Sequence, residues 1–420
     1  MTYTPPQTPT QTLRGSRAFR FLWIADAASQ HGTAAATAVV PLLAATTLAA
    51  GPFQIGVLTA AETAAFLIIG LPAGAWIDRC HRRRRVLIGA DLVRALLFLA
   101  IPIAAWFGVL TLAQLIGTAL AAGAATVFFD AAYQAYLPDV VGADGLESGY
   151  ANLQITQSVG AAAGPGLGGL LSQLTSTATA LAGTALGYVT SATLLGRIPV
   201  PERPQPVLPH SSLRRDIADG VRHTLGHPTL RALTLTSTLA AFFTSAVMTV
   251  EVLYFTRELY LDAFGTGIML ALSGVGSVVG AATTRRWTRR LGTSRALQLV
   301  PLLTWPAHLL LPLAWPGLGI AVAAAGIVIY AAGATTYNVL AMTQRQRATP
   351  DALRGRVNAG MRVAIWGSMP LGALGAGVLA EHIGTRTTLW IAIAGILTAL
   401  APLMTHRVTT AVDEAHGGRC

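Results

Sequence analysis

The sequence Gly74-Ala-Trp-Ile-Asp-Arg-Cys-His-Arg-Arg-Arg-Arg-Val86 is a short, strongly basic segment between two long apolar runs. One run ends at Ala73, and the next extends from Val86 to Ala105. Because arginine side chains are costly to place in hydrocarbon, the segment must be a turn between two membrane-spanning helices. Basic loops of this kind stay on the cytoplasmic side, so the turn predicts the orientation of the whole chain.

The composition indicates a protein built for a lipid bilayer. Of its 420 residues, 53% are hydrophobic and only 11% are charged, whereas soluble domains carry about 25% charged residues. Apolar runs of about 20 residues are long enough to cross a hydrocarbon core as helices. The short alternating segments that transmembrane strands require are not apparent. We therefore predict an all-α membrane protein.

The net charge of +11 raises the question of a nucleic-acid partner. All 29 basic residues are arginines, and they recur in blocks between the apolar runs. That pattern is typical of membrane topology, so we predict no nucleic-acid partner. Cys80 and Cys420 both lie in segments expected in the cytoplasm, so no disulfide is predicted. We predict no metal site and no cofactor.

Twelve apolar stretches predict twelve transmembrane helices. Their expected limits are 19–45, 54–77, 86–107, 112–136, 149–173, 177–196, 230–256, 265–287, 296–314, 318–342, 357–380 and 387–404. The expected domain organisation is a disordered tail over 1–16, a six-helix half over 17–196, a linker over 197–228, a second half over 229–406 and a tail over 407–420. Ser211 and Ser212 are candidate caps for a short amphipathic helix in the linker.

This arrangement predicts a multi-pass protein of the cell membrane with both termini in the cytoplasm. Of the 29 arginines, 26 then lie in the cytoplasmic segments or at the cytoplasmic ends of the helices beside them, and the other three are Arg94, Arg257 and Arg386. Turning the protein over would place nearly all of its basic charge on the wrong side of the membrane.

The two halves repeat each other in sequence. Residues 285–290, Arg-Arg-Trp-Thr-Arg-Arg, occupy the place of the basic turn in the second half, although without its aspartate. Pro138-Asp139 in the first half is echoed by Pro350-Asp351 in the second. Such repetition predicts two pseudo-symmetric six-helix halves with a substrate site between them.

The basic turn resembles the signature between the second and third helices of major facilitator superfamily transporters, a glycine followed by Asp-Arg and a basic cluster. Its key positions are matched by Gly74, Asp78, Arg79, Arg82 and Arg83. Trp76 stands where leucine is usual, and His81 stands where a second glycine is usual. The resemblance implies the major facilitator fold, which has twelve helices in two six-helix halves.

The same resemblance implies a latch that holds the halves together while the cytoplasmic side is closed. Its expected members are Gly74, Asp78, Arg79, Arg82 and Asp130. Asp78 would face the N-terminal end of the predicted helix 357–380, whose unpaired N–H groups favour an anion. Asp130, expected at the cytoplasmic end of the predicted helix 112–136, would lie within reach of Arg82.

The predicted helix 149–173 carries a second motif that resembles the glycine–proline signature of exporters in the drug/proton antiporter families. Its residues are Gly160, Gly164, Pro165, Gly168 and Gly169. Glycines four residues apart form a bare ridge that lets another helix approach closely, and proline invites a bend. We expect a complementary ridge at Gly276 and Gly280. Generic packing of small residues is the alternative interpretation.

Five acidic residues lie inside predicted spans, where a functional role is the default hypothesis: Asp26, Glu62, Asp91, Asp130 and Glu251. Asp91 precedes Arg94 by one helical turn, so this pair is expected to neutralise itself. Glu62 has no basic residue within a turn and is the first candidate for proton coupling, followed by Asp26. Alternatively, Glu62 only lines a wet cavity. Asp26 and Glu251 lie near helix ends and could simply reach water.

The residues 128–139 and 354–358, together with the glycine–proline motif, resemble the enterobactin-exporter-like branch of the superfamily over residues 19–380. The resemblance implies a monomeric secondary active exporter of a small amphipathic molecule, such as a drug or antibiotic. Export would proceed by alternating access and would be driven by proton antiport. Residues 112–127 lack the arginine that drug/proton antiporters often carry in this helix.

Gln157, Tyr337 and Asn338 are the candidate polar contacts of the substrate. The alternatives are a dedicated exporter of a siderophore or secondary metabolite and, more distantly, a polytopic membrane enzyme or sensor. An enzyme or sensor would need clustered ligands, paired carboxylates at one membrane face or an attached soluble domain.

Overall fold

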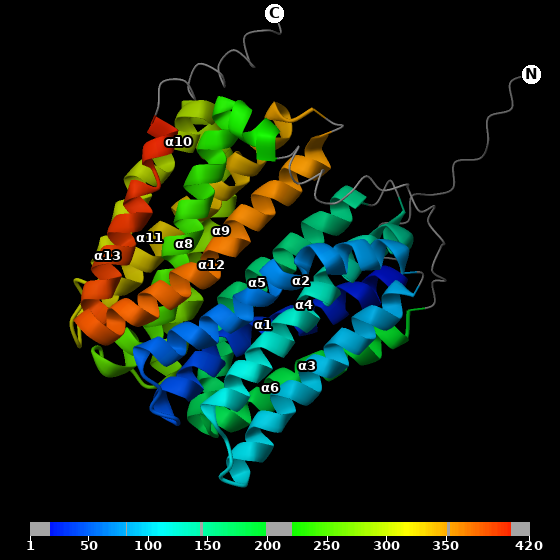
Figure 1. Ribbon diagram of the computed structural model, residues 1–420, viewed down its shortest axis with the longest axis vertical. Coiled ribbons are helices and arrows are strands. Elements are labelled where there is room, and N and C mark those ends of the chain that lie inside the picture. Colours follow the sequence, from blue (N-terminus) through cyan, green and yellow to red (C-terminus); the bar gives the residue numbers. More distant parts are fainter. Residues whose placement is uncertain (1–16, 81, 143–145, 199–220, 351–352, 405–420) are drawn as a thin grey trace, which may run out of the picture.

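The computed structural model describes residues 17–80, 82–142, 146–198, 221–350 and 353–404, and every regular element in these ranges is helical. The N-terminal half consists of α1 (Arg17–Thr46), α2 (Pro52–Arg79), α3 (Arg83–Trp106), α4 (Leu112–Val141), α5 (Leu146–Leu174) and α6 (Thr177–Gly196). The C-terminal half consists of α8 (Pro228–Arg257), α9 (Ala263–Leu291), α10 (Thr293–Thr304), α11 (Gly319–Ala348), α12 (Arg354–Ile383) and α13 (Thr385–Thr398). The predicted all-α fold in two six-helix halves is confirmed (Figure 1).

Within the described residues, nine helices are long and apolar enough to cross a membrane. The helices α1, α5 and α10 are the other three of the twelve. Both α1 and α5 carry polar residues that face the interior of the protein, which lowers their apolar character. The predicted span 296–314 is not one α-helix, because α10 continues into the 3-10 helix η2 (Trp305–Leu310) at Pro306. Proline lacks the N–H that an α-helix needs at that position.

The halves lie side by side, and two pairs of long helices join them. Helix α2 packs along α12, and α5 packs along α9. Helices α3 and α6 lie on the outer side of the N-terminal half (Figure 1). Leu96 on α3 is 68% exposed and Leu186 on α6 is 66% exposed, so these helices present apolar side chains to lipid.

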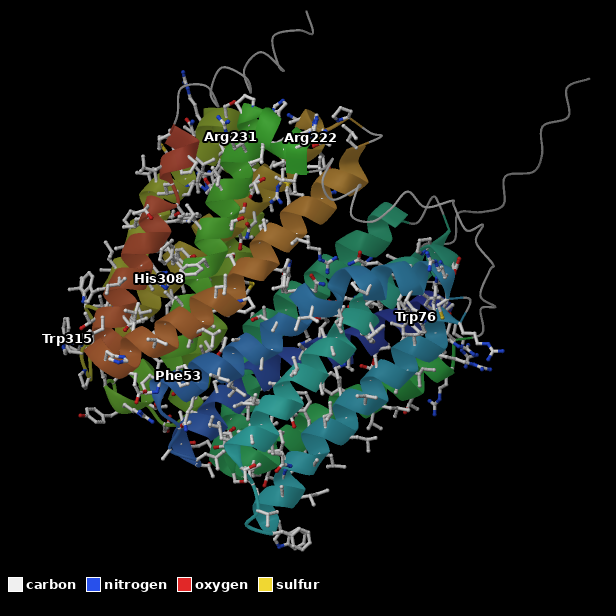
Figure 2. All side chains as sticks on the ribbon, viewed as in Figure 1. Phe53, Trp76, Arg222, Arg231, His308 and Trp315 are labelled. Carbon is white, nitrogen blue, oxygen red and sulfur yellow. The ribbon has the colours of Figure 1, made fainter. Side chains whose placement is uncertain are left out.

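The bundle has two distinct ends. The basic end carries the connections that follow α2, α6, α9 and α11, and the opposite end carries those that follow α1, α3, α5, α8 and α12. Arg222 and Arg231 lie at the basic end of the C-terminal half, whereas Phe53 and Trp315 lie at the opposite end (Figure 2). The short amphipathic helix predicted for the linker falls mostly on residues 199–220, outside the described residues.

Candidate functional site

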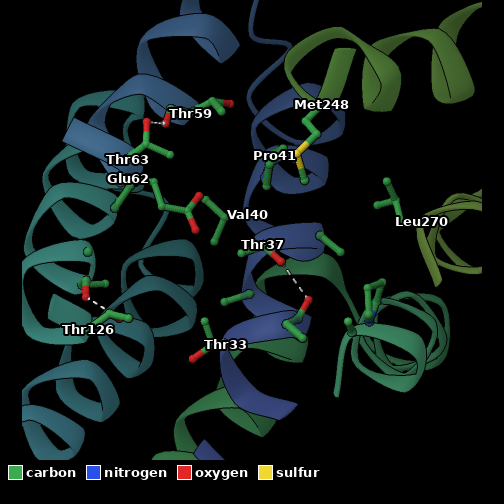
Figure 3. A pocket seen from close by; sticks show the side chains of 18 of the residues that line it. Thr33, Thr37, Val40, Pro41, Thr59, Glu62, Thr63, Thr126, Met248 and Leu270 are labelled. Atoms are coloured by element: carbon green, nitrogen blue, oxygen red, sulfur yellow. Dashed lines mark hydrogen bonds between the residues drawn. The ribbon is translucent and has the colours of Figure 1, made fainter. Parts of the chain in front are cut away.

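A cavity of about 490 Å³ lies between the two halves. Helices α1 to α6 line it from the N-terminal half, and α8, α9 and α12 line it from the C-terminal half. Its volume is within the range of roughly 300–1,000 Å³ that is typical of small-molecule sites. Small and apolar side chains share the lining with threonine and serine hydroxyls, two glutamines and four charged groups (Figure 3).

Three acidic side chains line this cavity: Glu62 on α2, Asp130 on α4 and Glu251 on α8. Glu62 and Glu251 are both partly buried and come from different halves. Figure 3 shows the Glu62 carboxylate beside Val40 of α1. Gly123 of α4 packs against the backbone of Glu62, so the absence of a side chain there lets α2 and α4 approach closely.

Arg94 is the basic residue of the described cavity lining, and it is held by several groups of its own half. Its Nη2 lies 2.5 Å from Asp91 Oδ1 and donates to Ser29 Oγ at 3.0 Å. Its guanidinium carbon lies 4.5 Å from the ring centroids of both Phe129 and Tyr188. The predicted local pairing of Asp91 with Arg94 is therefore present, and the buried positive charge has its counter-ion beside it.

Arg94 and Glu251 also line the cavity, although neither was predicted from the sequence as a site residue. Helical spacing was the available signal, because Arg94 and Phe98 are one turn apart on α3 and both line the cavity. Ser245, Met248 and Glu251 form a similar stripe on α8. Glu251, which the sequence places near a helix end, lies in the cavity lining.

Aromatic rings of the two halves meet beside the cavity. Phe66 of α2 and Trp366 of α12 are stacked, with ring centroids 4.6 Å apart and an interplanar angle of 21°. Both residues line the cavity. The stacked pair gives the site a flat apolar surface.

The predicted substrate contacts divide into two groups. Gln157 of α5 lines the cavity. Tyr337 does not, because its helical register points it into the core of the C-terminal half, where its hydroxyl lies 3.1 Å from Ser237 Oγ. Asn338, the next residue along α11, is exposed and is not part of the cavity lining either.

The second proton-coupling candidate, Asp26, is 3% exposed and lies on α1 outside the cavity lining. Burial contradicts the alternative that this carboxylate simply reaches cytoplasmic water. The side chain of Gln30, one turn along α1, is a hydrogen-bond partner of Asp26 and does line the cavity. Asp26 is therefore one side chain away from the cavity.

The residues of the expected latch occupy separate places in this conformation. Gly74, Asp78 and Arg79 lie in the last turns of α2, and Arg82 precedes α3 as an exposed residue. The side chain of Asp78 is outside the described part of the structure. Helix α4 continues to Val141 rather than ending at 136, which places the half-buried Asp130 about three turns from the basic end.

Asp130 therefore lies in the cavity lining and not beside Arg82 in this conformation. The cations whose charges act on it are Arg94 and Arg362. The buried arginine of the basic turn is Arg83, which donates to Ala135 O at 2.9 Å and lies 3.7 Å from Asp139 Oδ2.

The glycine–proline motif presents two faces. Gly164 and Gly168 pack against Ala34, Ala35 and Val39 of α1, and Gly160 packs against Gln30 of the same helix. Gly169 instead meets Gly267 of α9 across the boundary between the halves. Pro165 lines the cavity.

The expected partner ridge at Gly276 and Gly280 is wrong. These two glycines pack against Val328, Ala331 and Ala332 of α11. Gly267 and Gly274 face α5 instead, because seven residues span two helical turns and bring both to one face.

Comparison with known proteins agrees with this architecture. The chain is 27% identical over 346 residues to the multidrug efflux pump Tap of Mycolicibacterium fortuitum, which covers 79% of this chain and 82% of Tap. The nucleoside transporter NupG superimposes with a TM-score of 0.76 at 12% identity, over 92% of this chain and 99% of NupG. An inward-facing bacterial homologue of the iron transporter ferroportin gives a TM-score of 0.74 at 16% identity, over 92% and 98% of the two chains.

At these identities the solved structures establish the fold, and the family match establishes the relationship. The match to the transmembrane secretion effector family extends over residues 8–417, which is nearly the whole chain. The predicted major facilitator architecture is thereby confirmed, and the alternative of a membrane enzyme or sensor is not supported. The chain belongs to the transmembrane secretion effector family of the major facilitator superfamily and is a multi-pass membrane transporter of small molecules.

Proposed function

We propose that this transporter exports small amphipathic molecules, such as drugs or antibiotics, by proton antiport across the cell membrane. The observation that carries the proposal is the cavity between the halves, which is lined by a carboxylate from each half, Glu62 and Glu251. The similarity of the chain to the multidrug efflux pump Tap supports drug efflux as its activity. A cavity between two halves is the site expected of an alternating-access transporter.

For export, we propose that both termini and the basic end of the bundle lie in the cytoplasm. We also propose that the protein works as a monomer. The positive-inside rule is the basis of this assignment, since the connections rich in arginine all lie at that end. Reporter fusions after Gly196 and after Cys420 are both expected to give a cytoplasmic signal. An external signal at either position would overturn this orientation.

Glu62 is the proposed proton carrier, and Asp26 is the second candidate. A carboxylate that faces a wet cavity in one state and a dry one in the other binds its proton with different affinity in the two states. This difference couples the conformation to the proton gradient. Binding of a proton also removes a negative charge from between the halves, which favours their closure around the site.

The test uses inside-out vesicles with an acidic interior, in which the transporter should accumulate the fluorescent dyes ethidium and Nile red. The Glu62→Gln variant is expected to lose accumulation of both dyes against a gradient while still exchanging the uncharged dye Nile red down its gradient. Uphill transport by this variant at the wild-type rate would exclude Glu62 and direct attention to Asp26. If the wild-type protein transports neither dye against its gradient, the proposal that it exports amphipathic molecules by proton antiport is overturned.

Asp262→Asn is the matched control. It also removes one carboxylate charge, but at the opposite end, where Asp262 Oδ1 accepts from Gly265 N at 2.7 Å as the N-cap of α9. Asparagine is an equally good N-cap, so the variant is expected to fold and transport normally.

A further inference from the structure

We infer that the substrate is an amphipathic organic cation, bound between the carboxylates of Glu62 and Glu251 with its apolar part against the stacked rings of Phe66 and Trp366. This inference rests on the proposed export function and specifies the substrate class for the same cavity.

The charge of the cavity is the first argument. Among the described residues that line it, Glu62, Asp130 and Glu251 are acidic and Arg94 is basic. The positive charge of Arg94 is already matched by Asp91 at 2.5 Å, a residue outside the cavity lining. The charges of Arg94 and Arg362 act on Asp130, so among the described residues Glu62 and Glu251 are the cavity carboxylates that no cation offsets. An anionic substrate would meet uncompensated like charge, whereas a cation would supply the missing counter-ion.

The origin of the two glutamates is the second argument. Glu62 is on α2 of the N-terminal half, and Glu251 is on α8 of the C-terminal half. Both side chains are partly buried and line the same cavity. A cation between them contacts both halves at once, so its binding favours the arrangement in which they are close together. Glu251 is therefore the residue of the C-terminal half that binds the charge of the substrate.

The apolar surroundings are the third argument, and they exclude a small inorganic cation as the best occupant. The volume of about 490 Å³ is far larger than a metal ion needs. Phe66 and Trp366 are stacked at 4.6 Å across the halves, and Met248 and Leu270 add further apolar surface. An organic cation can place its charge near the carboxylates and its rings on this surface, where aromatic packing adds to the contact.

The test measures selectivity with ethidium as the cationic dye and Nile red as the uncharged dye, in the inside-out vesicles described above. For Glu251→Gln, the ratio of ethidium transport to Nile red transport should fall by about tenfold, the equivalent of about 1.4 kcal/mol, because the variant no longer offsets the charge of ethidium. Glu251→Asp should restore part of that ratio. The control Asp262→Asn should keep the wild-type ratio.

Direct binding provides the second measurement. Tetraphenylphosphonium titrated into purified wild-type protein should bind, and Glu251→Gln should weaken its affinity by about tenfold. Size-exclusion chromatography of each variant establishes that it is folded. An unchanged dye ratio in folded Glu251→Gln protein, or preferential export of the anionic dye carboxyfluorescein, would overturn the inference. Export of Nile red without export of ethidium would overturn it while leaving the proposed export function intact.

Discussion

The two ends of the boundary between the halves are built differently. At the opposite end the halves are in direct contact, since Gly169 packs against Gly267 and Gly56 packs against Gly377. Arg257 of α8 also donates to the carbonyl of Ala50 at 2.7 Å, and Glu381 of α12 accepts from Phe53 N at 3.3 Å at the start of α2. Backbone approach and a few hydrogen bonds hold this end together.

At the basic end, Arg83 and Arg84 of the turn bind within their own half. Arg83 contacts Ala135 and Asp139 of α4. Arg84 donates to the carbonyl of Ile198, just beyond α6, at 2.5 Å. These contacts need no partner in the C-terminal half.

The comparison indicates how the transporter can change state at low cost. Few hydrogen bonds must break to separate the halves at the opposite end, and the glycine contacts carry no charge. At the basic end, Arg83 and Arg84 keep their partners whichever way the halves move. A two-state equilibrium of this kind can be shifted by a ligand or a proton that contacts both halves.

The largest expected effect comes from blocking the glycine contact. In Gly169→Val the new Cβ would lie 2.6 Å from Ala263 O and 2.9 Å from the Cα of Gly267, and backbone cannot move aside easily. Overpacking costs about 1–3 kcal/mol. At the upper limit, the equilibrium between the arrangement in which α5 contacts α9 and the arrangement in which they are apart is expected to shift roughly a hundredfold toward the latter. Dye accumulation in vesicles should fall in proportion.

The control for this variant is Gly89→Val, because nothing lies within 4 Å of a Cβ at Gly89 on α3. It should accumulate dye at the wild-type rate. If Gly169→Val also transports normally, the close approach of α5 and α9 is not required for transport, and the contrast between the two ends loses its functional meaning.

The second expected effect tests the latch at the basic end. Asp78→Asn should lower transport by roughly tenfold to thirtyfold, the effect of an anion at a favourable, partly buried helix N-terminus. Arg85→Gln, a change of an exposed arginine on the same turn, is the control and should have little effect. Wild-type transport by well-expressed Asp78→Asn protein would reduce the turn to a topology signal.

The fold could be predicted from sequence because hydrophobic length and arginine placement are local signals. Both signals predicted the order of the helices, and within the described residues nine of them are long and apolar enough to cross a membrane. Helix ends were less predictable, as Val141 shows, because the last turns of α4 are stabilised by tertiary contacts such as that of Arg83 with Ala135. The break in the predicted span 296–314 could have been found from Pro301 and Pro306.

The site was only partly predictable, because lining a cavity depends on the rotation of each helix relative to its neighbours. Glu62 and Gln157 line the cavity, as intramembrane polar groups that face the interior tend to do. Tyr337 does not line it, because its hydroxyl finds a partner inside its own half, here Ser237. Nothing local distinguishes a hydroxyl paired in the core from one that lines a cavity.

A smaller effect is expected from weakening a single hydrogen bond at the opposite end. Arg257→Gln removes the charge-assisted bond to Ala50 O, which contributes about 1.5–3 kcal/mol. The reporter is Thr37→Cys, a change in the cavity lining, in a background with Cys80 and Cys420 changed to serine. Labelling of the Thr37→Cys reporter by a membrane-impermeant maleimide from outside intact cells should become about tenfold faster.

The smallest effect is expected from the matched change at the basic end, Arg83→Gln in the same reporter background. Arg83 and Arg257 each donate to a backbone carbonyl, at 2.9 Å and 2.7 Å, but only the bond of Arg257 crosses between the halves. Arg83→Gln should therefore alter the labelling rate by no more than about twofold. Arg83 is buried beside Asp139. Its loss should therefore lower the free energy of unfolding of the purified protein by about 3 kcal/mol. Equal acceleration of labelling by both variants would show that the two ends are coupled, and the contrast between them would then be wrong.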